Sequence, residues 1–194
     1  MDFPVDAALA AQVAHHAEHS FCGRDIGLAS FLVSALAHPG CAMLVDTHRL
    51  EWSHICCDLN GHKVLGINTQ APCPETPEES ARRVADCELC LDVLSGSRHG
   101  TSLQDVSMQE LYSGLGLVPE NARRHCLHVV GENERVLQMV DAVRHQDFDQ
   151  MGRLLFQSHE SLRDLYEVST PEVDWVVRHA ADIDGVCGAR LVGG

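Results

Sequence analysis

The sequence predicts an α+β fold, and three observations support this prediction. Most of the chain carries apolar residues at the spacing of amphipathic helices. Short apolar runs bounded by turn residues, which are typical of strands, occur mainly before residue 70. Strands and helices do not alternate regularly, which argues against a doubly wound parallel sheet. The length of 194 residues suits one domain or most of one.

Six segments are expected to be helical. The first covers residues 7–19, where alanines and a leucine recur at helical spacing and Asp6 precedes them as a cap. The second begins after Gly27, ends near Pro39 and is apolar enough to be largely buried. The other four are expected over residues 78–94, 120–145, 148–163 and 171–181.

Four segments are expected to be strands. Residues 41–46 form a short apolar run between turn residues. Residues 52–58 and 63–69 have a similar character, and the Asn60-Gly61 pair between them predicts a turn that joins them. Residues 185–192, where small and apolar residues alternate, are expected to form the last strand.

The composition argues against some binding partners and indicates the cellular compartment. The chain has 14 basic and 28 acidic residues, a net charge of −14, and such a surface repels nucleic acid and anionic membranes. The longest apolar run, residues 26–37, is too short to span a bilayer. The amino terminus lacks the pattern of a secretion signal, so a cytoplasmic, reducing location is expected. The nine irregularly spaced cysteines are accordingly expected to be free thiols.

Three blocks of the sequence carry a family resemblance. The longest is RLLFQSHESLRDLYEVSTPEVD at residues 153–174. A second block lies between Gly27 and Glu51, and a third is HVVGENERV at residues 128–136. In their order and spacing these blocks resemble the galactokinases, which are sugar 1-kinases of the GHMP kinase superfamily. The resemblance covers nearly all of this chain, whereas the chain covers only part of a kinase of this family.

The resemblance implies the fold and the reaction. The expected fold is a GHMP-kinase-like carboxy-terminal (ferredoxin-like) portion with part of the preceding domain. Residues 1–60 would be the remnant of the amino-terminal domain after the nucleotide loop, and residues 61–194 the carboxy-terminal domain, truncated at its glycine-rich motif. The family reaction is ATP-dependent phosphorylation of galactose at C1, with ATP and Mg²⁺ as cofactors and galactose or a related sugar as substrate.

Two family motifs are not found in this sequence: the sugar-binding G-R-x-N-x-I-G-E-H segment and the glycine- and serine-rich nucleotide loop. Backbone amides of such a loop hold the phosphates and a serine hydroxyl binds the metal. The chain alone is therefore expected to bind neither ATP nor Mg²⁺. Gly193 and Gly194 match only the start of a second glycine-rich motif, an incomplete nucleotide-binding element.

Several positions depart from the family pattern. The family segment G-[IL]-M-D-Q carries the catalytic base, and counting from the substrate-binding position Gly27 places Ser30 where that aspartate stands. Phe31 then occupies the position of the glutamine. Ser80 takes the place of a substrate-binding tyrosine, and Leu127 that of an arginine. Since a serine hydroxyl is neutral at pH 7 and has no carboxylate to accept a proton, catalysis is expected to be impaired or absent.

Other residues favour structural roles. His159 and Asp164 lie in the SHESLRD block and are interpreted as part of a scaffold helix and its exit turn. Cys87 and Cys90 have metal-ligand spacing but no second pair, so no metal site is expected. Ser30 lies in an apolar helix with no histidine near it in sequence, which argues against a nucleophile.

Three functional hypotheses remain open. The chain is an impaired galactokinase-like protein, a non-catalytic sugar sensor or regulator of the same family, or a truncated product with no independent role. Exposed apolar faces in a partial chain would also favour self-association or a complementing chain.

Overall fold

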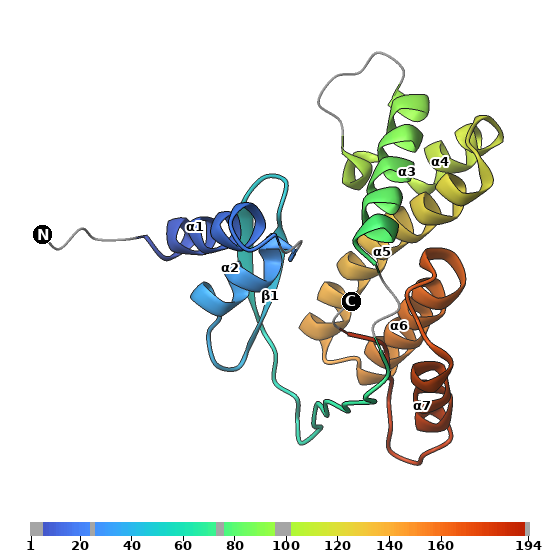
Figure 1. Ribbon diagram of the computed structural model, residues 1–194. Helices are drawn as coiled ribbons and strands as arrows, with labels where there is room; N and C mark the ends of the chain where they lie inside the picture. The colour runs from blue at the N-terminus through green and yellow to red at the C-terminus, as the bar shows by residue number, and fades with distance from the viewer. Residues whose placement is uncertain (1–5, 24–25, 73–75, 96–101, 193–194) are drawn as a thin grey trace, which may run out of the picture. The chain divides into compact units, whose positions relative to one another are not determined.

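The computed structural model describes residues 6–23, 26–72, 76–95 and 102–192 (Figure 1). The contacts divide the chain into two compact units, Met1–His62 and Lys63–Gly194, and each unit is described by itself. Helices predominate and the sheet of the described residues has two strands, so the predicted α+β class is confirmed. Within the described ranges, no helix combines the length and the apolar character needed to cross a membrane.

The first unit contains two helices and a β-hairpin. Helix α1 (Ala7–Ser20) is capped by Asp6, whose carboxylate accepts a hydrogen bond from the Ala8 amide at 3.3 Å. Helix α2 (Leu28–Leu36) packs on α1, and Leu32 is its buried residue. The expectation that this second helix is largely buried is therefore wrong, because most of its side chains are exposed.

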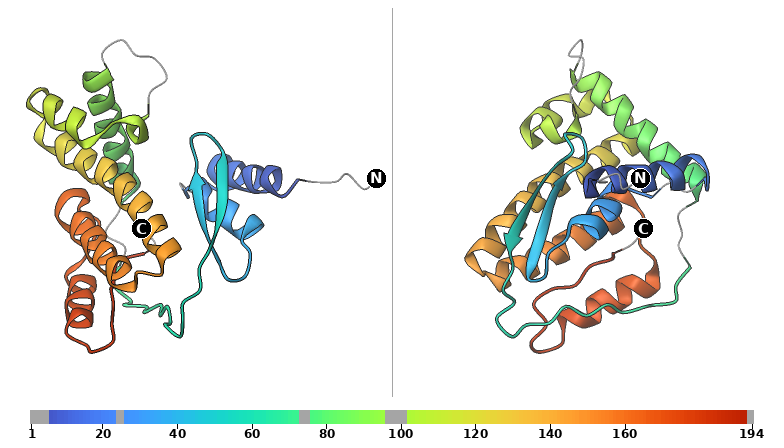
Figure 2. Two further views of the ribbon diagram at one scale, coloured as in Figure 1. Left: turned by 180° about the vertical axis from the view of Figure 1, so that it is seen from behind. Right: turned by 90° about the vertical axis from the view of Figure 1, so that its left-hand side faces the viewer.

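The hairpin pairs β1 (Cys41–Asp46) with β2 (Glu51–Cys56) in antiparallel register, from Cys41 opposite Cys56 to Asp46 opposite Glu51. The Asp46 carboxylate caps the turn by accepting hydrogen bonds from the amides of His48 and Arg49 at 3.0 and 2.8 Å. Both helices lie on the same side of the hairpin (Figures 1 and 2).

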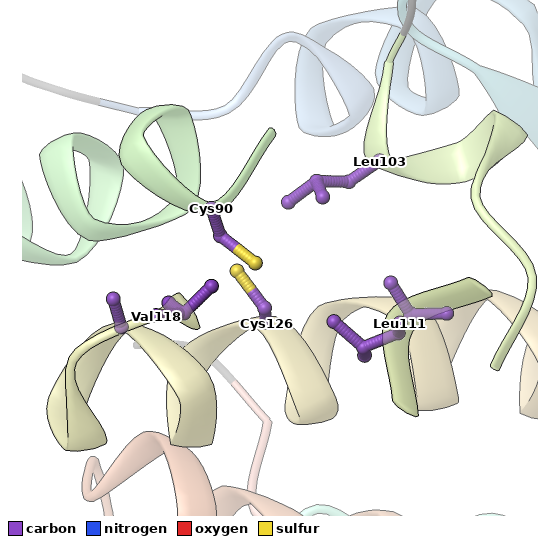
Figure 3. Close-up of a cluster of buried hydrophobic side chains, with 7 residues drawn as sticks. Cys90, Leu103, Leu111, Val118 and Cys126 are labelled. Carbon is purple, nitrogen blue, oxygen red and sulfur yellow. The ribbon is translucent and has the colours of Figure 1, made fainter. Parts of the chain in front are cut away.

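The second unit is helical. Its elements are α3 (Pro77–Ser95), the 3₁₀ turn η1 (Leu103–Asp105), α4 (Met108–Gly114), the 3₁₀ turn η2 (Leu115–Leu117), α5 (Glu120–His145), α6 (Phe148–Ser161), the π-helical turn η3 (Leu162–Tyr166) and α7 (Pro171–Ala181). Helices α3, α4 and α5 and the turn η1 share one core, shown in Figure 3. Its buried members are Cys90, Leu103, Leu111, Val118, Ala122, Cys126 and Val130.

Helices α5 and α6 form an antiparallel pair (Figure 1). The chain reverses at Gln146, which adopts a left-handed conformation with φ 54°, and Asp147 caps α6 by accepting a bond from the Gln150 amide at 2.9 Å. Residues 185–192, which follow α7, are called the terminal segment. Gly152 of α6 lies so close to this segment that a Cβ on residue 152 would be 1.8 Å from the Cys187 carbonyl oxygen. The contact between helix and terminal segment therefore requires glycine at this position.

The predicted helices are present, and the bounds of α5 and α7 agree with the prediction. Two predicted strands are wrong. Residues 63–69 form no helix or strand, and Val64, Leu65 and Ile67 are exposed. Residues 185–192 follow α7 as an irregular segment that packs on α6. The turn at Asn60 and Gly61 exists, but it joins no strands.

Candidate functional site

The first candidate site is the amino-terminal turn of α2, which brings Gly27 and Ser30 together. Gly27 caps the helix in an extended conformation that any residue can adopt. The Ser30 amide donates to the Gly27 carbonyl at 3.3 Å, and the Ser30 carbonyl accepts from the Ser34 hydroxyl at 2.9 Å. The Ser30 side chain is exposed. This turn therefore presents the Ser30 hydroxyl at the position predicted from the sequence for the family's base.

The neighbours of Ser30 do not activate it. In the described part of the chain, its hydroxyl has no hydrogen bond to a histidine or carboxylate that could remove its proton. Phe31, the next residue, packs edge-on against the ring of His15 on α1 with centroids 5.6 Å apart. Phe31 thus joins the two helices of the first unit.

The other predicted positions lie in the second unit or outside the described residues. Ser80 is partly buried in the first turns of α3, where its amide donates to the Thr76 carbonyl at 3.0 Å. Leu127 packs against the core cluster of α5 as an apolar residue. Gly193 and Gly194, the predicted incomplete nucleotide motif, lie outside the described residues.

The two arginines after Ser80 have different roles. Arg82 is exposed and lies 4.0 Å from the Asp86 carboxylate. Arg83 is buried, donates from Nε to the Tyr166 carbonyl at 2.9 Å, and lies over the Tyr166 ring at 5.2 Å from its centroid. Arg83 therefore holds the carboxy-terminal end of the π-helical turn η3, where the Tyr166 carbonyl accepts its hydrogen bond.

The sequence reasoning did not identify a network of polar side chains centred on Glu132 of α5. The Glu132 carboxylate accepts hydrogen bonds from the Ser158 hydroxyl at 2.6 Å, from Arg135 Nε at 2.7 Å and from Arg190 Nη1 at 3.1 Å. Burial alone would raise the pKa of Glu132, but these hydrogen bonds and both guanidinium charges hold it below its usual value. Glu132 therefore joins α5 to α6 and to the terminal segment as a carboxylate.

His159 of α6 makes a second connection. It is 2% exposed, and its Nδ1 accepts a hydrogen bond from the Leu191 amide at 3.3 Å. Its Nε2 lies 3.2 Å from Oδ1 of Asp174, and the same Oδ1 atom accepts a hydrogen bond from the Ser169 hydroxyl at 2.6 Å. Burial lowers the pKa of His159, and the Asp174 carboxylate opposes only part of this change. His159 therefore links α6 to α7 and to the terminal segment.

His128 of α5 is also buried and neutral. Its Nδ1 lies 2.8 Å from the Ser161 hydroxyl, and its ring stacks on Tyr166 with centroids 4.5 Å apart. Burial lowers the pKa of His128 to about 4. His125, one turn earlier, lies 3.0 Å from the Asp86 carboxylate, and burial lowers its pKa as well.

These contacts have a structural role, because they hold α5, α6, α7 and the terminal segment together. Ser158, His159 and Ser161, all from the SHESLRD block, point into the unit and hold α6 against its neighbours. Asp164 is exposed, and its carboxylate accepts a hydrogen bond from Nε of the adjacent Arg163 at 2.7 Å in the exit turn. Over the described ranges, no group of three or more His, Cys, Asp or Glu side chains is placed to hold a metal ion.

Comparison with known proteins identifies the class and then the family. No protein-family model matches the chain. A crystal structure of Lactococcus lactis galactokinase complexed with galactose superposes with a TM-score of 0.91 at 25% identity, over 98% of this chain and 50% of that chain. The fold is therefore that of part of a GHMP sugar kinase.

Two other galactokinases have a higher sequence identity to this chain than the Lactococcus lactis protein has. The chain is 37% identical over 183 residues to a galactokinase of Thermotoga neapolitana, and the match covers 94% of this chain and 50% of that protein. It is also 37% identical over 187 residues to the human galactokinase, covering 96% and 47%. By sequence and fold the chain belongs to the galactokinase family, and it spans about half the length of the relatives it matches.

Proposed function

We propose that the chain is a galactokinase-like protein whose family reaction is ATP-dependent phosphorylation of galactose at C1, and that it is catalytically impaired or inactive as this 194-residue chain. The observation that supports impairment is Ser30, an exposed neutral hydroxyl at the family's base position in the first turn of α2. A general base typically contributes about 10²–10⁴-fold to a rate. Replacement of the base by a serine would therefore lower the rate by a similar factor without any change of fold.

The substrate would be galactose or a related sugar, the ligand of the Lactococcus lactis relative. Gly27 and Ser80 are the positions of this chain that correspond to the family's sugar contacts. Serine at position 80 retains a hydroxyl for hydrogen bonding but lacks the aromatic ring on which a sugar face can pack.

ATP and Mg²⁺ are the cofactors of the family. Among the described residues, no group of three or more His, Cys, Asp or Glu side chains is placed to hold a metal ion. The sequence carries no nucleotide loop whose amides would hold the phosphates, and we expect the chain alone to bind neither ATP nor Mg²⁺.

A turnover assay tests the proposal. The purified chain is incubated with galactose, ATP and Mg²⁺, and both ADP and galactose 1-phosphate are measured, with Lactococcus lactis galactokinase as the positive control. We expect no product above a blank without protein. Product at a rate near that of the control would overturn the proposal.

The alternative is a non-catalytic sugar sensor or regulator. One observation favours it: the family fold is kept, with a TM-score of 0.91, although the base position has changed. Calorimetric titration with galactose, and separately with ATP, distinguishes the two proposals. Saturable binding of galactose without product supports a sensor, whereas the absence of both binding and product supports a chain with no independent role.

A further inference from the structure

Two cysteines lie opposite one another in the hairpin of the first unit. Cys41 is the first residue of β1, Cys56 is the last residue of β2, and the register makes them direct cross-strand partners. In the register of this described hairpin, theirs is the one pair formed by two cysteines. Both are free thiols, and Cys56 is exposed whereas Cys41 is half-buried. Because directly opposed residues share a face of a hairpin, the two side chains extend to the same side.

The backbone hydrogen bonds around these two cysteines show that they form a non-hydrogen-bonded pair. The Cys57 amide donates to the Gly40 carbonyl at 2.9 Å, which is the bond between the residues that flank the pair. The Cys41 amide donates to the His38 carbonyl at 3.2 Å, within the preceding turn, and not across to Cys56. In antiparallel strands, partners of this type have Cα atoms about 4.5 Å apart. Since disulfides usually join Cα atoms about 4.4–6.8 Å apart, the strands hold these cysteines at a distance that a disulfide can span.

Cys57 is the nearest competitor for a bridge to Cys41. It follows β2 directly and is half-buried, and its amide continues the ladder of the hairpin. Successive residues of an extended chain point to opposite faces, so the side chain of Cys57 extends away from the face that Cys56 shares with Cys41. The register therefore selects Cys56 as the partner of Cys41.

We propose that Cys41 and Cys56 form a site of reversible oxidation, at which a small-molecule disulfide such as oxidised glutathione produces a disulfide across the open end of the hairpin. The bridge would join the residue at which the chain enters β1 to the residue at which it leaves β2, so the strands could no longer separate from that end. The structure describes the reduced state. This inference is independent of the proposed kinase function.

The oxidation proceeds in two balanced exchange steps. Cys56, the exposed thiol, loses its proton to solvent, and its thiolate attacks one sulfur of the small disulfide. A mixed disulfide forms on Cys56, the original sulfur–sulfur bond breaks, and the other half leaves as a thiolate that takes up a proton. The thiolate of Cys41 then attacks the Cys56 sulfur, the protein disulfide forms, and the second small thiol leaves and is protonated. Two protein thiols are oxidised and one small disulfide is reduced to two thiols.

Mass spectrometry can identify this bridge in the whole chain. The reduced protein is incubated with oxidised glutathione, the remaining thiols are alkylated, and the chain is digested with trypsin. Trypsin cleaves after Arg49, so Cys41 falls in one peptide and Cys56 and Cys57 fall together in the next. We expect these two peptides to be linked, with a mass lower than their sum by two hydrogen atoms. Fragment ions should place the bridge on Cys56 and the alkyl group on Cys57, and dithiothreitol should release both peptides.

Two variants and an unfolded sample test whether the register directs the reaction. Cys41→Ser should keep glutathione on Cys56 because no second thiol can displace it, whereas Cys57→Ser should form the bridge as the wild type does. Cys187→Ser, at an exposed cysteine of the second unit, is the matched control and should leave the bridge unchanged. Circular dichroism establishes that each variant is folded. In urea the wild-type chain should lose its preference for Cys56 over Cys57.

The wild-type chain alone can overturn the inference, so the test does not depend on the variants. The inference is wrong if Cys41 stays alkylatable in the folded chain after oxidation. It is also wrong if the bridge joins Cys41 to Cys57, or if the folded and the urea-unfolded chains give the same mixture of bridges.

Discussion

Acidification should weaken the second unit through His128. This imidazole is 6% exposed, stacks on Tyr166 and lies 2.8 Å from the Ser161 hydroxyl on α6. A proton on the ring would place a positive charge where water cannot reach it. The charges around the site do not compensate, since Glu132 favours the charged form whereas Arg135, Arg190 and His125 oppose it.

The magnitude follows from the two pKa values. The folded pKa of His128 is about 4, against 6.5 for an unperturbed histidine. Because the unfolded chain binds the proton first, the free energy of unfolding is unaffected above pH 6.5 and falls as the pH drops from 6.5 toward 4. Each unit of difference corresponds to about 1.4 kcal/mol, so His128 contributes a loss of about 3 kcal/mol across this window.

Urea unfolding followed by circular dichroism between pH 7 and pH 4 measures this loss. His128→Gln removes the titrating group and keeps a hydrogen-bonding side chain, so its stability should fall by about 3 kcal/mol less than that of the wild type over the same range. His145→Gln, an exposed substitution at the end of the same helix, should behave like the wild type. Equal pH dependence of His128→Gln and wild type would refute the reasoning.

Two further predictions concern the contacts of α6 and the terminal segment. Glu132→Ala should lower the free energy of unfolding, measured in urea, by about 2–4 kcal/mol. The substitution leaves two guanidinium groups and a hydroxyl without their shared acceptor. The control Glu134→Ala, at an exposed position, should have the stability of the wild type. Gly152→Ala should destabilise by more than about 2 kcal/mol, although alanine favours helices, because its Cβ would overlap the Cys187 carbonyl. Thermal unfolding measures Gly152→Ala against the control Gly116→Ala, whose added Cβ meets nothing within 4 Å and whose unfolding temperature should stay near that of the wild type. A Gly152→Ala chain as stable as this control would disprove the close contact with Cys187.

The sequence predicts elements whose signals are local. Helices α5 and α7 have the expected bounds because a proline marks the start of each, Pro119 as the cap of α5 and Pro171 as the first residue of α7, and because each carries an amphipathic pattern. Helix α4 was missed although its signal is present: Ser107 and Glu110 form a reciprocal capping box, with the Glu110 carboxylate accepting from the Ser107 amide at 2.9 Å. A helix of only seven residues carries too little periodicity to stand out from its apolar neighbours.

Elements that depend on distant partners were not predictable in the same way. Residues 63–69 have the composition of a strand, but a strand requires a neighbour, and local pattern cannot show that these residues lack one here. The contact between Glu132 and Ser158 joins residues 26 positions apart on different helices. Both residues lie in family-like blocks, so their importance was visible, whereas the hydrogen bond itself is a property of the tertiary structure.

The most direct test of the central claim is the effect of Ser30→Asp on galactose phosphorylation, measured in a full-length context, that is, in a polypeptide that also carries the sugar-binding segment and the nucleotide loop not found in this sequence. Restoring a carboxylate at the base position should raise the rate of galactose 1-phosphate formation by about 10²-fold or more. Ser30→Asn, similar in size but uncharged, and Ser34→Asp, one turn further along α2, should give no increase. If Ser30→Asp leaves the rate unchanged, or if Ser30→Asn raises it equally, position 30 does not limit catalysis.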